Sequence, residues 1–592
     1  MRASLNQTKG RGGQSDRRGA EELPEEVSVK RSDPVYNAHA YLTKVPVTAI
    51  EPFLDAFSAP GDVVLDMYGG SGMTGVAAAM HGRRAEVRDI SALGRHIGSN
   101  YMNLVDSEEL RERARRVIGA AEARLGDLYA VQCGECDSNA TLSRTVWTYI
   151  YECGRCHAPV NYYEALREVE WKKSALKCGS CGEPFVTRAA RRLGEAPMID
   201  TIACDCSPRL RDYPHVCPPH PVPADAPIWP GVPIGEDRQM FQASALRKHG
   251  LLSTDAFFSR RNLAVLSVLR QEIDRIDDES IRSKLMFSFT AILSRASKRY
   301  QWHPKRPLNA ANQNYYVAPV FYEWNVYDLF ERKIEAAVRS DAYIRSRMKS
   351  LGLAAPGAFN YSVGSADELD LEDGSVDYVF IDPPFGSNLF YSDMNLFQEA
   401  WLGAFTDDTR EAVIDRSRGK KGRGTDHYED LLVGSLCEAA RLLRPDGWLS
   451  IVFSNSNGEM WALMQRAIRK AGFYLGEVTL LNKGQRSVKG LASGFENVVT
   501  ADLVLSMQKT GEVAADEPPT APSEPLSKMI DGALRAGAAR TPSHLYLRII
   551  RRYLQHNWDL RDLHIADIVR AIESSGFEVD VGSGELIESK AA

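Results

Sequence analysis

Short apolar runs separated by polar segments predict buried strands in this chain. Residues 63–66 and 376–382 are such runs, and each ends in an aspartate. Residues 448–453 and 498–507 have the same character, and the pattern between them predicts a helix over about 459–470. Strands that alternate with helices indicate an α/β fold with a doubly wound, mostly parallel sheet. Ligands bind such sheets at the carboxyl ends of the strands, where the two aspartates would lie.

The polar segments divide the chain. Residues 1–33 mix Gly, Arg, Glu and Ser without periodicity, which predicts a flexible tail, and four prolines after residue 517 predict a linker. Helical spacing over 544–554 predicts a small helical unit at the end. The two α/β segments are much further apart than a normal strand–helix–strand crossing, so an insertion must separate them. The predicted divisions are a tail (1–33), the first half of the α/β domain (34–125), a cysteine-rich insertion (126–225), a helical and basic insertion (226–354), the second half of the α/β domain (355–509), a linker (510–527) and a C-terminal helical unit (528–592).

Composition narrows the class of protein. The 592 residues are 44% hydrophobic and 25% charged, as is typical of a globular protein. The net charge of −6 excludes a polycation, so any contact with nucleic acid must come from local basic patches. No apolar run has the length that a membrane span needs, and the N-terminal stretch up to Arg31 lacks the apolar core of a signal peptide. We therefore expect a cytoplasmic protein with no membrane partner.

A glycine-rich turn follows the first predicted strand. Gly69, Gly70 and Gly72 precede an alanine-rich helix, and glycines there allow a tight turn and a close approach of the backbone to a ligand. Asp89 ends the next predicted strand, about 20 residues on, where a carboxylate can accept hydrogen bonds from ribose hydroxyls. The spacing fits an adenosine-type cofactor, and a purely structural turn remains the alternative.

The sequence Asp-Pro-Pro-Phe at 382–385 follows the second aspartate-ended strand. The two prolines fix φ and carry no N–H, so the backbone there offers acceptors only. Asp382 and the Pro383 carbonyl could accept hydrogen bonds from an amino group on a flat heterocycle, while Phe385 stacks on its ring. The alternative is a rigid turn after a strand.

These two motifs together resemble those of the S-adenosylmethionine-dependent N6-adenine and N4-cytosine DNA methyltransferases. The first motif of that family reads roughly D-P-F-x-G-S-G, and the chain has Met67 and Tyr68 in place of Pro and Phe. Residues 36–46 resemble the segment that lines the methionine end of the cofactor, and Asp367 resembles the residue that reads its adenine. The resemblance implies a Rossmann-like class I methyltransferase domain. It also implies these cofactor-binding residues: Lys44, Asp66, Tyr68, Gly70, Ser71, Gly72, Thr74, Asp89 and Asp367.

The same resemblance implies the reaction and its catalytic residues, which are Asp382, Pro383, Pro384 and Phe385. The target base would be flipped out of the helix, and its exocyclic amino group would take the methyl group. An Asp at 382 favours adenine N6 over cytosine N4. We expect DNA as the substrate, in restriction–modification or phage defence, with restriction or defence subunits as further partners. Two alternatives remain: an RNA amino-methyltransferase, and a non-catalytic DNA-binding subunit on a decayed methyltransferase scaffold.

The cysteines indicate metal sites. Nine of ten lie between 133 and 217, and without a signal peptide thiolate–zinc sites are favoured over disulfides. The pair spacing predicts one four-thiolate zinc site from Cys133, Cys136, Cys153 and Cys156. It predicts a second site from Cys178, Cys181, Cys204 and Cys206, with Cys217, His215 and His220 competing for its last position. We expect a zinc ribbon with two structural ions.

A basic, aromatic stretch is the predicted target-recognition surface. Residues 281–350 hold 13 Lys and Arg against 5 Asp and Glu, and they are rich in Asn, Tyr and Trp. Such residues suit phosphates, base edges and stacking on bases. A solvated helix face is the alternative, and the Gly-rich basic run at 416–423 is a second candidate. The predicted nucleic-acid contacts are Arg299, Tyr300, Trp302, Lys305, Arg306, Arg418, Lys420 and Lys421.

Overall fold

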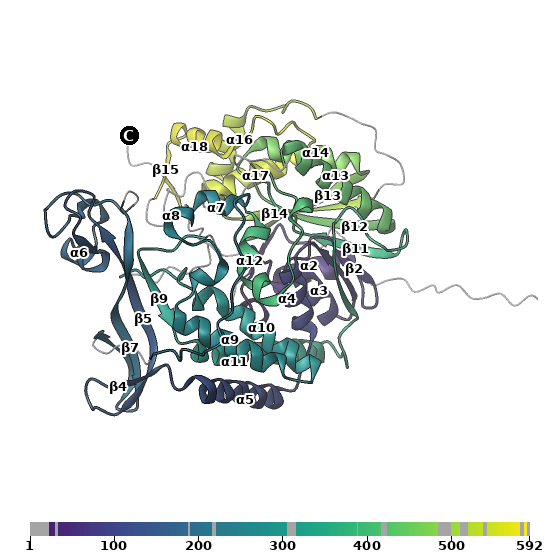
Figure 1. Ribbon diagram of the computed structural model, residues 1–592. Helices are drawn as coiled ribbons and strands as arrows, with labels where there is room; N and C mark the ends of the chain where they lie inside the picture. The colour runs from purple at the N-terminus through teal and green to yellow at the C-terminus, as the bar shows by residue number, and fades with distance from the viewer. Residues whose placement is uncertain are drawn as a thin grey trace, which may run out of the picture.

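The chain folds around one large sheet with helices on both sides (Figure 1). The computed structural model describes residues 23–29, 33–187, 190–215, 221–244, 246–304, 315–386, 389–415, 423–482, 499–509, 519–536, 541–580 and 585–588. Among these residues, no helix is long and apolar enough to cross a membrane.

The main sheet has eight strands among the described residues. Their order is β1 (Glu26–Ser28), β13 (Phe473–Asn482), β14 (Asp502–Lys509), β12 (Leu443–Phe453), β11 (Val376–Ile381), β2 (Val63–Asp66), β3 (Arg84–Asp89) and β10 (Phe359–Val363). The run from β12 to β10 is wholly parallel, and β14 is antiparallel to both of its neighbours. The predicted α/β fold with a mostly parallel sheet is therefore confirmed, although β12 starts earlier than the apolar run at 448–453.

Alternating side chains of the central strands separate two apolar cores. Tyr378 and Phe380 point into one core with helices α2 (Val47–Phe57) and α3 (Met73–Met80). Val379 and Ile381 point into the other core with α13 (Thr425–Leu442) and α14 (Gly458–Lys470). This period-two alternation is what a strand buried on both faces requires. Because both faces of these strands are buried, the sequence shows unbroken apolar runs there.

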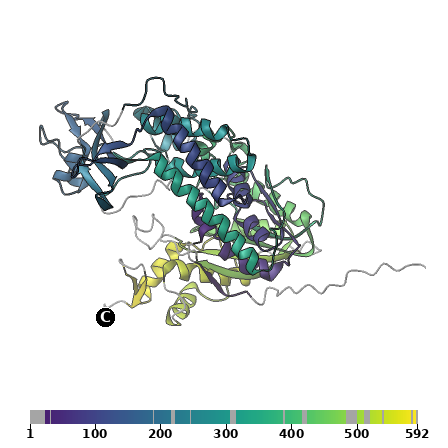
Figure 2. The same cartoon turned by 90° about the horizontal axis from the view of Figure 1, so that it is seen from below.

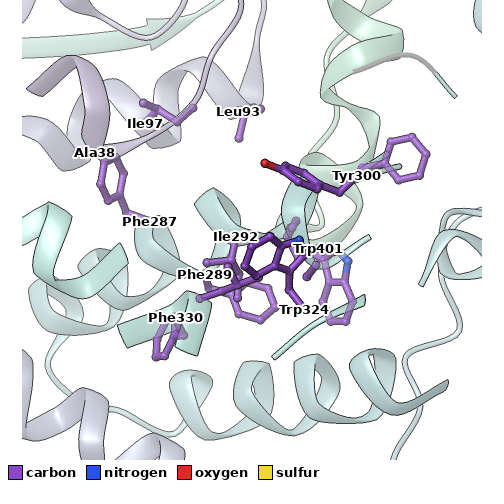
Figure 3. Packing of buried hydrophobic residues seen from close by; sticks show 14 of the residues in the cluster. Ala38, Leu93, Ile97, Phe287, Phe289, Ile292, Tyr300, Trp324, Phe330 and Trp401 are labelled. Atoms are coloured by element: carbon purple, nitrogen blue, oxygen red, sulfur yellow. The ribbon is translucent and has the colours of Figure 1, made fainter. Parts of the chain in front are cut away.

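A layer of further helices packs against the first core. It contains α1 (Pro34–Ala38), α4 (Ala92–Met102), α5 (Ser107–Leu125), α9 (Arg260–Asp274), α10 (Glu279–Ala296), α11 (Val326–Ser350) and α12 (Tyr391–Leu402), while α7 (Gln239–Ala243) and α8 (Leu246–His249) are short. Figure 3 shows Phe287, Phe289 and Ile292 of α10 among side chains from α4 and α12. The helices of the insertion thus share a core with the α/β domain.

The cysteine-rich insertion forms an antiparallel sheet that extends from one side of the molecule (Figures 1 and 2). Its strands are β4 (Ala130–Gln132), β5 (Asn139–Glu152), β6 (Pro159–Asn161), β7 (Arg192–Cys204), β8 (Ser207–Pro214) and β9 (Val320–Trp324), with α6 (Tyr162–Glu168) near one end. The long strand β5 pairs with β7 along most of its length and with β9 near its middle. Because β9 leads directly into α11, this pairing joins the arm to the helical layer.

The C-terminal residues form three helices and a hairpin in the part of the chain that the structure describes. The helices are α16 (Leu526–Arg535), α17 (Pro542–Gln555) and α18 (Ile565–Ser574), followed by a hairpin of β15 (Phe577–Val579) and β16 (Leu586–Glu588). Leu545, Ile549 and Ile568 lie in the same apolar core as Val478 and Leu503 of the main sheet. The unit is therefore packed onto the α/β domain over β13 and β14, and it shares a core with that domain.

Candidate functional site

A cavity opens at the carboxyl edge of the main sheet, between β2 and β11. The strand order reverses there, since the chain continues from β2 to β3 on one side and from β11 to β12 on the other. Such a switch point is where open α/β sheets bind ligands. The cavity has about 970 Å³ of empty space, its open mouth included. It is lined by residues 41–45, 66–71, 73–74, 89–91 and 364–367, by Phe380, Asp382 and Pro384, and by parts of 391–431.

Most of the predicted site residues meet at this cavity, although they come from two distant halves of the chain. Those that line it are Lys44, Asp66, Tyr68, Gly70, Ser71, Thr74, Asp89, Asp367, Asp382 and Pro384. Gly72, Pro383 and Phe385 stand beside lining residues in the chain. Gly72 caps the start of α3 with a φ of 79°, and a Cβ there would lie 2.9 Å from the Cα of Gly98. Helix packing therefore also requires this glycine.

Asp89 fixes the shape of the glycine turn. One carboxylate oxygen accepts from the backbone N–H of Gly70 at 2.7 Å, and the other from that of Ser91 at 2.8 Å. The Tyr361 hydroxyl donates to the Gly70 carbonyl at 2.7 Å from the neighbouring strand. A carboxylate has about four acceptor positions, so Asp89 can hold the turn and still accept from a ligand hydroxyl.

The cavity is acidic, and two of its acids, Asp66 and Glu411, are buried. Asp66 is 4% exposed, and burial together with the nearby Asp89 and Asp382 raises its pKa to about 7. Burial also raises the pKa of Glu411, at the opposite wall, to about 6. A site that concentrates carboxylates in this way favours a cationic ligand, which would relieve their mutual repulsion.

Lys44 lines the cavity, but its ammonium group is directed at the end of helix α1. It donates to the carbonyl of His39 at 2.6 Å and to that of Tyr36. Lys333 of α11 donates to the neighbouring carbonyl of Ala38 at 2.9 Å. Two cations thus satisfy the exposed carbonyls at the C-terminus of α1, where the helix dipole favours positive charge. These hydrogen bonds fix the position of residues 41–45, which line the cavity. The sequence pattern did not indicate that Lys44 has this structural role.

Asp367 is paired with a residue that the sequence analysis missed. Its carboxylate accepts from the Arg410 guanidinium at 2.7 Å at the rim of the cavity, and the two side chains are 23% and 43% exposed. Arg410 ends a short 3₁₀ turn, Asp408–Arg410, whose sequence carries no ligand-binding motif. The structure therefore places a cation beside the carboxylate that was expected to read adenine.

The Asp-Pro-Pro-Phe loop is held by two side chains from other elements. The Tyr428 hydroxyl of α13 donates to the Pro384 carbonyl at 2.7 Å, and Asn455 Nδ2 donates to the Phe385 carbonyl at 3.0 Å. The Phe385 ring lies edge-on to Phe453, with 5.3 Å between ring centres. Neither Tyr428 nor Asn455 belongs to a recognisable motif, so no signal in the sequence singled them out.

The comparison with known families supports one interpretation of this geometry. Residues 9–107 match the model of the N6_N4 methylase family, which is described as DNA methylase. The matched region is similar to DNA methylases. The match contains Lys44, the glycine turn and Asp89, and it ends before the Asp-Pro-Pro-Phe loop. The resemblance inferred from the sequence is thereby confirmed, and the match supports DNA methyltransferase activity. A search of curated proteins found no relative of the chain.

The insertion brings eight cysteines into two clusters, but their pairing differs from the prediction. One cluster is Cys133, Cys136, Cys204 and Cys206, and the other is Cys153, Cys156, Cys178 and Cys181. The prediction joined the Cys133–Cys136 turn to the Cys153–Cys156 turn, and the Cys178–Cys181 turn to Cys204 and Cys206. This was wrong because the 14-residue strand β5 separates the first two turns. A strand of that length spans roughly 45 Å. His215 instead shares a hydrogen bond with Asp200 at 2.7 Å, while Cys217 and His220 lie outside the described residues.

Both clusters have dimensions that fit zinc. Sulfur–sulfur distances are 3.6 Å in the first cluster and 3.7 and 3.8 Å in the second. Four sulfurs around a tetrahedral ion with bonds of about 2.3 Å lie roughly 3.8 Å apart. Four thiolates leave no open position on the ion, so each cluster suits a structural metal.

The predicted nucleic-acid contacts differ in where the structure places them. Arg299 and Tyr300 are buried, and the Arg299 guanidinium lies 3.7 Å from the centre of the Phe397 ring (Figure 3 shows Tyr300). Expecting them to contact nucleic acid was therefore wrong for this conformation, because the aromatic neighbours that suggested stacking on bases form a core. Trp302 packs between Tyr163 and Trp171. Lys305, Arg306, Arg418, Lys420 and Lys421 lie outside the described residues.

Proposed function

We propose that the chain is an S-adenosylmethionine-dependent DNA methyltransferase that modifies the N6 amino group of a flipped adenine. The observation that carries the proposal is the meeting of the glycine turn and the Asp-Pro-Pro-Phe loop at one cavity, at the switch point of the sheet. The family match covers the first of these segments and supports the general class. A role in restriction–modification or phage defence stays a prediction.

The residues of the cavity fit the proposed cofactor. S-adenosylmethionine carries a sulfonium and an ammonium group, and a cavity lined by Asp66, Asp89, Asp382 and Glu411 favours cations. Asp89 has acceptor capacity for ribose hydroxyls, and Asp367 is the proposed acceptor for the adenine amino group. When bound, the cofactor supplies an activated methyl group.

The Asp-Pro-Pro-Phe loop would orient the target. The Asp382 carboxylate and the Pro383 carbonyl accept the two amino hydrogens, which leaves the nitrogen lone pair directed away from them. Phe385 provides the face on which the flipped base stacks. Holding the amino group in this way supplies rate by positioning. The carboxylate at 382 supports adenine as the target base.

The proposal is tested by methylation of bulk unmethylated DNA beside bulk RNA, followed by mass spectrometry of the nucleosides. We expect N6-methyladenine from DNA alone. Asp382→Ala should lower the methylation rate by about a hundredfold or more, because alanine offers no acceptor for the amino group, while cofactor affinity stays within about twofold. Asp370→Ala, at an exposed carboxylate outside the cavity, is the matched control.

Other outcomes would change the proposal in defined ways. Detection of N4-methylcytosine would show that cytosine is the target base and would leave the proposed mechanism unchanged. Label in RNA alone would establish the RNA alternative. Cofactor binding without methyl transfer would contradict the assigned reaction. A fully active Asp382→Ala variant would contradict the role assigned to Asp382.

A further inference from the structure

The loop that follows β12 holds the carbonyl of Phe385 through Asn455. The side-chain amide of Asn455 donates to the Phe385 carbonyl at 3.0 Å, and its Oδ1 accepts from the backbone N–H of Asn457 at 3.0 Å. The indole of Trp461 donates to the Asn455 carbonyl at 2.9 Å. With a donor on one side of its amide and an acceptor on the other, Asn455 has only one orientation that satisfies both contacts.

The C-terminal unit holds this loop just beyond Asn455. The backbone N–H of Gly458 donates to His564 Nδ1 at 3.1 Å, and the N–H of Ile565 donates to the Ser456 carbonyl at 3.2 Å. The two backbones lie against each other, since a Cβ on Gly458 would come within 2.1 Å of the Leu560 carbonyl oxygen. His564 also satisfies one of the free N–H groups at the start of α14.

These contacts form a continuous path from the C-terminal unit to the catalytic loop. We propose that Asn455 is a positioning residue for the Asp-Pro-Pro-Phe loop, and that the C-terminal unit supports it through His564. The inference rests on the proposed function. It assigns the C-terminal unit to the catalytic domain, where the sequence suggested only a linked helical unit.

The geometry explains why this support matters for the reaction. Phe385 is half-buried, and its ring lies edge-on to that of Phe453. Tyr428 holds the Pro384 carbonyl from α13, and Asn455 holds the next carbonyl from the loop after β12. Both anchors together fix the peptide planes around the groups that would face the base. A displacement of about 1 Å at such a site can cost about a hundredfold in rate.

One isosteric variant tests the role of Asn455, and a second isosteric variant is its control. Asn455→Asp removes the donor to the Phe385 carbonyl and sets a carboxylate against it. Gln465→Glu is the control, because Gln465 lies further along α14 and donates to Asn557 and Trp558 of the same C-terminal unit. We expect kcat to fall at least about tenfold in Asn455→Asp, with the Kd for S-adenosylmethionine unchanged, whereas Gln465→Glu keeps kcat within about twofold.

A second pair of variants tests the support from the C-terminal unit. His564→Leu removes the acceptor for Gly458, whereas His564→Asn offers Oδ1 at nearly the position of the histidine Nδ1. We expect His564→Leu to lower kcat several-fold and His564→Asn to restore it. A purely stabilising contact would instead give equal kcat values in both variants at a temperature where both are folded.

A measurement without activity separates this inference from the proposed function. Hydrogen–deuterium exchange of peptides that contain Phe385 and Gly386 should rise in Asn455→Asp and His564→Leu, and should not rise in Gln465→Glu. Wild-type protein that fails to methylate DNA would overturn the proposed function, while this exchange pattern would still establish the structural path. Unchanged exchange together with unchanged kcat in Asn455→Asp would overturn the inference.

Discussion

Replacing Asp66 by asparagine should stabilise the folded protein at neutral pH. Asp66 is buried at the end of β2, and burial together with the charges of Asp89 and Asp382 raises its pKa from 3.8 to about 7. A difference of one in pKa is worth about 1.4 kcal/mol, so ionising Asp66 costs at most about 4 kcal/mol of folding free energy. Asparagine keeps an oxygen for the N–H of Tyr68, which donates to Asp66 at 3.1 Å, and carries no charge.

The pH dependence follows from the direction of the shift. Since the folded-state pKa of Asp66 is the higher one, the folded protein binds more protons than the unfolded chain between about pH 4 and pH 7. The stability that this proton contributes is complete below about pH 4 and is lost as the pH rises through about 7. Of the total, about 2 kcal/mol falls between pH 5.5 and pH 8. The Asp66→Asn variant lacks this loss, so its advantage over the wild type grows with pH.

Urea unfolding followed by tryptophan fluorescence at pH 5.5, 7 and 8 measures the effect. The difference in unfolding free energy between Asp66→Asn and wild type should increase by about 2 kcal/mol from pH 5.5 to pH 8. Asp370→Asn, at an exposed carboxylate, should show no such trend. A wild type and an Asp66→Asn variant whose curves stay parallel across this range would show that Asp66 ionises without cost, and the acidic character of the cavity would lose its physical basis.

Two further predictions concern the cysteine clusters and the cavity rim. The chain should bind two zinc ions. The double variant Cys133→Ser, Cys204→Ser should lose one ion, whereas the double variant Cys133→Ser, Cys153→Ser should lose both. If metal analysis gives the reverse, the pairing expected from the sequence is correct. Arg410→Gln should tighten S-adenosylmethionine binding up to about fivefold in calorimetry, because the part-exposed ion pair with Asp367 competes with the adenine amino group for at most about 1 kcal/mol. Weaker binding by the variant would show that Arg410 contributes to the cofactor site.

The central strands and the two motifs were predictable because each depends on local chemistry. Residues 63–66 and 376–381 form strands where the apolar runs predicted them, since a strand buried on both faces needs apolar residues at successive positions. The glycine turn was visible because Gly70 and Gly72 adopt positive φ, a conformation that favours glycine. Prolines at 383 and 384 carry a similarly local signal.

The cysteine clusters and the basic stretch were misjudged because their outcome depends on distant pairing. Spacing identified Cys-x-x-Cys turns, yet which turns share an ion depends on a ladder between β5 and β7 that places Thr141 opposite Ala203. Arg299 and Tyr300 sit in a basic, aromatic sequence, but Phe397 of a different segment encloses the guanidinium. A count of charged and aromatic residues does not show which of these side chains are buried.

The residues that support the site could not be identified from the sequence, for a third reason. Tyr428, Asn455 and Arg410 each hold the site by an ordinary side-chain donor, which is a hydroxyl, an amide or a guanidinium. Such donors occur in many residue types throughout a sequence and mark no motif. Motifs mark positions where the backbone itself must be unusual, whereas support is supplied by whichever element happens to pack nearby. In this chain the C-terminal unit packs there, which is why helices without a motif, far along the chain from the Asp-Pro-Pro-Phe loop, contact the segment that holds it.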